Sequence, residues 1–168
     1  MRLATVAAAA GVWGLFAWVL AGGAVAQSVS LRGPAGQTRS LTLAELAAMP
    51  HQSAMLPNEH GPAKPCDGVP LTLLLQSVGA PVGKALHGPA LADRVVVGAG
   101  DGYRVVLGLA ETDPGVRPGK ILLADRCEGA PLPTNEGPFR LVVEGDLRPV
   151  RSVRMVTAIS VETASPPN

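Results

Sequence analysis

Residues 94–109 read RVVVGAGDGYRVVLGL, and this stretch carries the strongest fold signal in the chain. Two valine-rich runs, residues 95–97 and 105–107, flank the tripeptide GDG at residues 100–102. Asp-Gly between apolar runs favours a tight turn, because glycine adopts positive φ without steric cost. The stretch therefore predicts a β-hairpin, and Tyr103, the only tyrosine of the chain, follows directly after its turn.

The first 26 residues have the pattern of a secretory signal peptide. Arg2 supplies the positive start, residues 4–20 are apolar and uncharged, and residues 24–26 read AVA, a small-residue cleavage pattern. We expect cleavage before Gln27 and a periplasmic or secreted protein. A retained anchor is the alternative, because the apolar segment approaches the roughly 20 residues that span a bilayer.

The composition of the mature chain excludes some partner classes. Removing 26 of the 168 residues leaves 142, enough for a single domain, which we place at 27–161 with a polar, disordered tail at 162–168. Without Arg2, thirteen basic residues balance thirteen acidic residues, so there is no basic excess for nucleic acid. Only Tyr103 and Phe139 remain as aromatic residues, which disfavours base stacking. We expect no nucleic-acid partner, and no membrane association after cleavage.

Two cysteines, Cys66 and Cys127, lie in the mature part. In an oxidising compartment two cysteines predict one disulfide. The alternative is that one of them is a metal ligand or a redox thiol, because spacing alone does not show that they are close. Residues 49–66 also hold histidines and methionines, which raises the idea of copper, but their order is not that of a blue-copper site. We interpret this segment as an irregular strand and loop.

Two short helices are expected. Thr42 and Glu45 match a capping box at the start of the first helix, which Pro50 ends. Its apolar face is predicted to comprise Leu43, Leu46 and Ala47. Residues 68–75 read GVPLTLLL and predict that the second helix opens there, with Pro70 near its first turn. Its helical spacing predicts a core contribution from Leu71, Leu74, Leu75 and Val78.

Further strands are expected on both sides of the hairpin. Apolar runs and alternating patterns place them at residues 28–32, 38–41, 121–124, 139–144 and 153–161. The count is about seven strands with two or three short helices, and the helices do not alternate regularly with the strands. The sequence therefore predicts a mixed α+β domain rather than a parallel doubly wound sheet.

Six motifs occur in an order that is similar to one known family. They are residues 68–71 (GVPL), 101–103 (DGY), 109–111 (LAE), 123–124 (LA) leading to 129–133 (GAPLP), 137–143 (GPFRLVV), and the basic terminal strand 151–161. This order resembles the molybdopterin-binding oxidoreductase domain of the sulfite oxidase family, and more narrowly its short exported members. The resemblance covers most of residues 40–161. It implies a mixed-sheet α+β fold that holds a molybdenum–molybdopterin cofactor through a cysteine thiolate.

The resemblance also implies site residues. Cys66 is the candidate molybdenum ligand, and hence the candidate catalytic position. Asp101 and Tyr103 are candidate cofactor-binding residues on the hairpin. Positive charge for an anionic cofactor would come from four arginines: Arg140, Arg148, Arg151 and Arg154. The alternative is that these arginines form the solvent-exposed face of two strands.

The chain also departs from the family pattern. Cys66 precedes Gly68 by two residues, whereas the ligand cysteine of active relatives lies well ahead of the GVPL motif. Residues 145–154 lack the tryptophan of the Lys-Trp pair that active members carry there. We therefore expect a reduced or lost cofactor site, with no cofactor bound, in an accessory module that binds a small molecule or a periplasmic protein. The alternative is an active periplasmic molybdenum-cofactor oxidoreductase, so enzymatic activity stays open. No nucleophile elbow or paired His/Ser arrangement supports a hydrolase.

Overall fold

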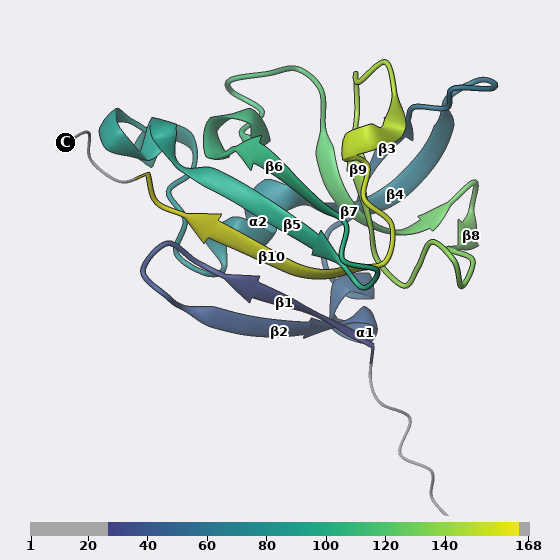
Figure 1. Ribbon diagram of the computed structural model, residues 1–168, viewed down its shortest axis with the longest axis horizontal. Helices are drawn as coiled ribbons and strands as arrows, with labels where there is room; N and C mark the ends of the chain where they lie inside the picture. The colour runs from purple at the N-terminus through teal and green to yellow at the C-terminus, as the bar shows by residue number, and fades with distance from the viewer. Residues whose placement is uncertain (1–26, 165–168) are drawn as a thin grey trace, which may run out of the picture.

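The computed structural model describes residues 27–164. The predicted signal peptide, and residues 165–168 of the predicted tail, lie outside this range. The described residues form two five-stranded sheets, two short α-helices and four 3-10 helices (Figure 1). One main core draws side chains from both sheets and from the second helix, among them Leu31, Leu74, Val97, Leu123 and Leu141. The predicted mixed α+β class is confirmed.

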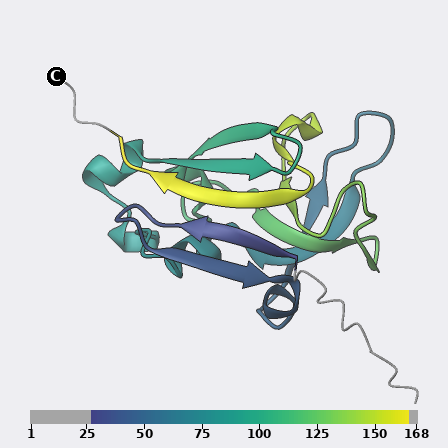
Figure 2. The ribbon, with the colours of Figure 1, turned by 60° about the horizontal axis from the view of Figure 1, so that its bottom comes forward.

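The first sheet has the strand order β2-β1-β10-β5-β6, and its strands lie side by side in Figure 2. Only β1 and β10 run parallel, and the other neighbours are antiparallel. Its strands are β1 (Ser28–Arg32), β2 (Thr38–Thr42), β5 (Arg94–Ala99), β6 (Arg104–Gly108) and β10 (Val156–Glu162).

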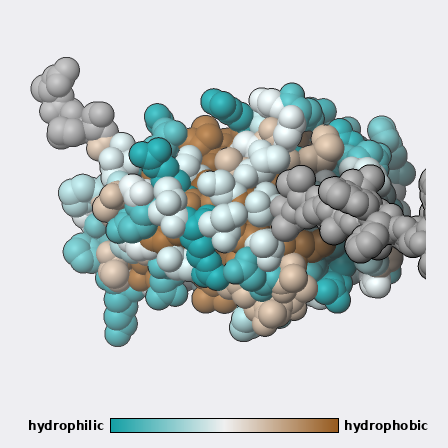
Figure 3. All heavy atoms as spheres, turned by 90° about the horizontal axis from the view of Figure 1, so that it is seen from below, coloured by the Kyte–Doolittle hydropathy of each residue, from teal (hydrophilic) through white to brown (hydrophobic). Residues whose placement is uncertain are grey.

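The outer face of β1 and β2 is polar. In β1 the side chains of Val29 and Leu31 are buried, whereas Ser28, Ser30 and Arg32 are exposed. Seen from below, most of the surface is polar, and apolar residues show only between polar ones (Figure 3). The alternation of buried and exposed residues along β1 has the period of two that a half-buried strand requires.

The central hairpin forms as predicted. Strands β5 and β6 pair in register, with Val95 opposite Leu107 and Val97 opposite Val105. The turn closes through hydrogen bonds from the backbone N–H of residue 99 to the carbonyl of residue 103 (2.9 Å) and from that of residue 102 to the carbonyl of residue 99 (3.1 Å). Gly102 has φ +87°, so the turn uses the left-handed conformation that glycine adopts without strain.

The second sheet has the order β3-β4-β7-β8, and β9 also pairs with β7. All its pairs are antiparallel. Strand β7 is central, and five of its seven residues are buried. The strands of this sheet are β3 (Gln52–Leu56), β4 (Lys64–Pro70), β7 (Ile121–Cys127), β8 (Ala130–Pro131) and β9 (Arg140–Val143).

The structure corrects the prediction for residues 49–70. The segment expected to be an irregular strand and loop, residues 49–66, contains β3 and the first three residues of β4, and residues 68–70 end β4 rather than open a helix. Strand β3 pairs with β4, and β4 pairs with β7, a partner more than fifty residues away that local composition does not reveal. A Cβ atom on Gly68 would lie 2.3 Å from the carbonyl oxygen of Leu123, so glycine is what lets β4 approach β7 this closely.

The two α-helices are short. Helix α1 (Leu43–Ala47) has the predicted capping box, in which Thr42 Oγ1 accepts from the N–H of Glu45 at 3.2 Å. Of its three expected core residues only Leu46 is buried, because a helix of five residues presents a single position to the sheets. Helix α2 (Leu71–Gln76) buries all four predicted core positions around it: Leu71, Leu74, Leu75 and Val78. None of the helices within residues 27–164 has the length and apolar character needed to cross a bilayer.

We expect Thr42→Ala to lower the free energy of unfolding by about 1 kcal/mol, the usual loss on removal of an N-cap hydroxyl.

The hydrogen bond from the Thr42 backbone also lowers the pKa of the Glu45 carboxyl. A lowered pKa stabilises the fold above the ordinary pKa of the carboxyl, and this contribution is lost as the pH falls through the lowered value. Urea unfolding should therefore separate Glu45→Gln from the wild type at neutral pH and less so in acid. Thr163→Ala, at an exposed site outside any helix, is the control and should change stability little. Equal losses for Thr42→Ala and Thr163→Ala would contradict the capping role.

The C-terminal boundary also differs from the prediction. Glu162 was expected to begin a disordered tail, but it is the last residue of β10 and its carboxylate pairs with Arg94 at 2.8 Å. The backbone N–H of Ala164 donates to Asp93 at 3.0 Å. The same strand begins at Val156 rather than at Val153, because Met155 just before it has φ +48°.

Candidate functional site

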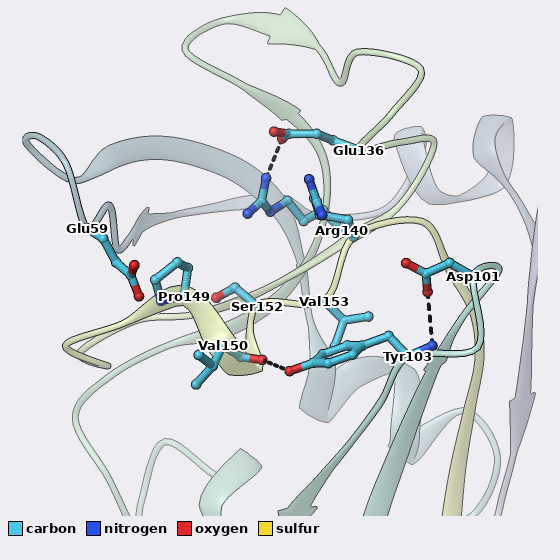
Figure 4. A pocket seen from close by; sticks show the side chains of 10 residues that line it. Glu59, Asp101, Tyr103, Glu136, Arg140, Pro149, Val150, Ser152 and Val153 are labelled. Atoms are coloured by element: carbon cyan, nitrogen blue, oxygen red, sulfur yellow. Dashed lines mark hydrogen bonds and ion pairs between the residues drawn. The ribbon is translucent and has the colours of Figure 1, made fainter.

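A pocket of about 370 Å³ lies where the turn of the β5–β6 hairpin meets the segment between β9 and β10 (Figure 4). Four of the residues predicted for the site line it: Asp101, Tyr103, Arg140 and Arg154. The hairpin turn supplies the first two, and Arg140 is the first residue of β9. The fold thus brings together positions about forty residues apart in the sequence.

Side chains from three further segments complete the lining. Glu59 comes from the loop between β3 and β4, and Glu136 from the loop before β9. Ser152 and Arg154 come from the segment between η4 (Pro149–Arg151) and β10. The pocket is consequently lined by three carboxylates and two guanidinium groups, so it presents both signs of charge to a ligand.

Arg140 is the most buried charged residue of the lining. It is 8% exposed, and its Nη1 donates to a carboxylate oxygen of Glu136. Its Nε is fully buried and has no hydrogen-bond partner within residues 27–164. Buried N–H groups nearly always have a partner, and those of a charged group most of all, so this nitrogen marks a place where a ligand acceptor would fit.

Tyr103 connects the hairpin to the opposite wall of the pocket. Its hydroxyl donates to the carbonyl oxygen of Val150 at 2.9 Å, and its ring is half exposed. The backbone N–H of Tyr103 donates to Asp101 Oδ1, also at 2.9 Å. Figure 4 shows that the second carboxylate oxygen of Asp101 points away from this bond. Asp101 therefore keeps one acceptor oxygen that forms no hydrogen bond with the described residues.

A network around Arg151 holds the η4 wall in place. Its Nε and Nη2 donate to the two carboxylate oxygens of Asp146 at 2.9 and 2.6 Å, and its Nη1 donates to Glu111 at 3.2 Å. The hydrogen bond to Asp146 raises the pKa of the Arg151 guanidinium above its already high ordinary value. Glu111 belongs to η3 (Leu109–Thr112), so the network ties η4 to the end of the hairpin.

Besides Arg151, two predicted residues lie outside the lining. Arg148 is 70% exposed on its side chain, and its Nε donates to Glu59 at 2.7 Å, so it contacts a lining carboxylate from the outside. Cys66 lies in the second sheet, where it faces Cys127 across the β4–β7 pair. The two sulfur atoms are bonded, with a Cα–Cα distance of 4.0 Å. Their side chains belong to the small apolar cluster on the second sheet and not to the pocket.

The sequence interpretation missed Glu59, Glu136 and Ser152. Glu136 stands four residues before Arg140, but this spacing predicts an ion pair only on a helix, and the segment is a loop. Glu59 meets Arg148 across a sequence separation of 89 residues, for which no local signal exists. Ser152 Oγ accepts the N–H of Val143 at 3.1 Å, a contact that depends on the path of the chain after β9.

The comparisons with known proteins concern the architecture. The sequence matches no family model and no curated protein sequence. Among solved structures it superposes on the crystal structure of the sulfane dehydrogenase SoxCD from Paracoccus pantotrophus with a TM-score of 0.61. The chain is similar in fold to a sulfane dehydrogenase. The match covers 80% of this chain and 38% of the SoxCD chain at 18% identity, so it shows the sulfite-oxidase-like fold alone.

The donor set differs from what a thiolate-held molybdenum centre needs. A metal-binding cysteine must be a free thiolate, and the two cysteines of this chain are bonded to each other. Asp101, a lining carboxylate without an ion-pair partner in residues 27–164, also opposes an anionic pterin phosphate. The likeness to SoxCD therefore describes the scaffold, and Cys66, the residue expected to hold molybdenum, is bonded to Cys127 outside this pocket.

Proposed function

We propose that this chain is an exported binding or accessory module that has a sulfite-oxidase-like fold and uses the Arg140 pocket to bind a small molecule or a periplasmic partner. The observation that carries the proposal is that Cys66 and Cys127, the only cysteines, are bonded to each other away from the pocket. No thiolate then remains to hold molybdenum. The pocket keeps polar and charged side chains that suit binding.

Export is supported by two independent features. Residues 1–26 have the signal-peptide pattern, with a single charge followed by a long apolar segment. The disulfide suits an oxidising compartment, because cytosolic reductants keep most thiols reduced. Together they favour the periplasm or the exterior.

The second candidate is an active molybdenum-cofactor oxidoreductase, which the fold likeness to a sulfane dehydrogenase favours. In this case Cys66 would be the metal ligand, and Asp101, Tyr103, Arg140 and Arg148 would surround the cofactor. This function requires the disulfide to open and the buried Cys66 to reach the metal. The cofactor would supply the redox chemistry, and the residues of the chain would bind and orient it.

Metal analysis and thiol titration decide between the two. The protein should be exported in a host that makes the molybdenum cofactor, then assayed for molybdenum, for pterin fluorescence, and for free thiols after denaturation. We expect neither molybdenum nor pterin, and no free thiol. About one molybdenum per chain, with Cys127 free, would instead establish the oxidoreductase.

A further inference from the structure

The guanidinium group of Arg140 has one edge without a protein partner. Nη1 is bound by Glu136, and within residues 27–164 no acceptor meets Nε or Nη2. Figure 4 shows the guanidinium group between Glu136 and the segment that carries Pro149 and Ser152. An Nε–Nη2 edge is a planar pair of donors that matches the two oxygens of a carboxylate.

The acidic groups of the same pocket favour a cation. Asp101 keeps a carboxylate oxygen without a hydrogen bond in the described chain, and it lies on an exposed turn. Glu59 and Glu136 add negative charge, although each already pairs with an arginine. A purely anionic ligand would approach three carboxylates, whereas a ligand with both charges can face the arginine and the acids at once.

The dimensions suit a compact molecule. A volume of about 370 Å³ lies at the small end of the range for ligand pockets. The lining also includes apolar groups from Pro149, Val150 and Val153, which can contact a short side chain. A molecule of amino-acid size satisfies these limits.

We propose that this pocket binds a small zwitterion of the amino-acid type, with its carboxylate on Arg140 and its ammonium group on Asp101. The inference rests on the proposed binding function, and it adds the class of ligand. Arg154 also lines the pocket and forms no ion pair within residues 27–164, so its positive charge is available to the carboxylate. The hydroxyl of Tyr103 holds the hairpin and the η4 wall together around the ligand.

Tyr103 provides a direct reporter. It is the only tyrosine in the chain and it lines the pocket, so labelling with 3-fluorotyrosine gives a single ¹⁹F resonance at the site. The purified full protein is titrated with the twenty common L-amino acids, first pooled by side-chain type and then singly. Each amino acid that shifts the resonance is compared with the matched carboxylic acid that lacks the amino group and with the matched amine that lacks the carboxylate.

We expect at least one amino acid to give a saturable shift, and its matched acid and amine to bind about tenfold or more weakly. Asp101→Asn and Arg154→Gln, both at exposed positions, should weaken binding of the amino acid, and Arg140→Gln should weaken it most. Arg39→Gln, on the distant edge strand β2, is the matched control and should leave the titration unchanged.

Three results would overturn the inference: no saturable shift with any amino acid, equally tight binding of the matched acid, or full binding by Asp101→Asn. If Arg140→Gln does not fold, the ligand comparison on the wild type and the two exposed variants still decides the question. The molybdenum assay separates this failure from that of the proposed function. A metal-free protein that ignores the ligands overturns only the ligand class, whereas bound molybdenum overturns the binding-module function.

Discussion

Replacing Cys66 with alanine is expected to lower the free energy of unfolding by about 4 kcal/mol, according to the chain-entropy description of a cross-link. The disulfide joins residues 61 positions apart, so it removes many conformations from the unfolded chain. In the folded protein it ties β4 to the central strand β7, and Cys66 is fully buried. Urea or guanidinium unfolding, monitored by circular dichroism, measures the loss.

The matched controls all remove the same disulfide. Cys127→Ala should lose a similar amount, and the double variant should lose little more than either single variant, because all three lack one bond. Wild-type protein unfolded with a reductant should behave like the variants. The ¹⁹F resonance of Tyr103 should keep its folded position in each variant, since the cysteines lie outside the pocket. Additive losses in the double variant would contradict a single stabilising bond between these residues.

The parts of the fold that follow from short stretches could be predicted from the sequence. The β5–β6 hairpin depends on valine runs around Asp-Gly, and the start of α1 depends on two side chains three positions apart. The pairing of Cys66 with Cys127 was also expected, although from the compartment and the cysteine count rather than from geometry. In each of these cases the sequence signal lies within a short stretch of the chain or in its composition.

The parts that were missed depend on partners far along the chain. Strand β4 contains Pro65 and Pro70, and its residues were expected to form an irregular segment and the opening of a helix. Its pairing with β7 supplies the hydrogen bonds and the burial that its local propensity lacks. The pocket shows the same limit. Asp101, Tyr103 and Arg140 were predicted as a group, whereas the acids that change its charge enter from separate loops. The charge balance of the site is therefore a property of the fold and not of any motif.

Phe139→Ala is expected to lower the free energy of unfolding by about 3–5 kcal/mol, the usual range for removing a large core aromatic side chain. Phe139 is fully buried, and among residues 27–164 it is the largest of the fully buried side chains. It directly precedes Arg140, and its carbonyl oxygen accepts the N–H of Val156 at 2.9 Å. The ring thus anchors the segment that carries the buried guanidinium group, so the substitution should loosen Arg140 as well as the core.

Leu147→Ala is the matched control, because it also shortens a large apolar side chain, in the loop between β9 and η4. Leu147 is 96% exposed, so its loss should change stability by less than about 0.5 kcal/mol. Phe139→Leu keeps much of the buried volume and should fall between the two. Chemical unfolding gives the stabilities, and the ¹⁹F titration of Tyr103 shows whether the folded fraction of Phe139→Ala binds amino acids more weakly. If Phe139→Ala were no less stable than Leu147→Ala, the ring would not anchor this segment, and the position of Arg140 would have to depend on its bond to Glu136 and on the pairing of β9 with β7.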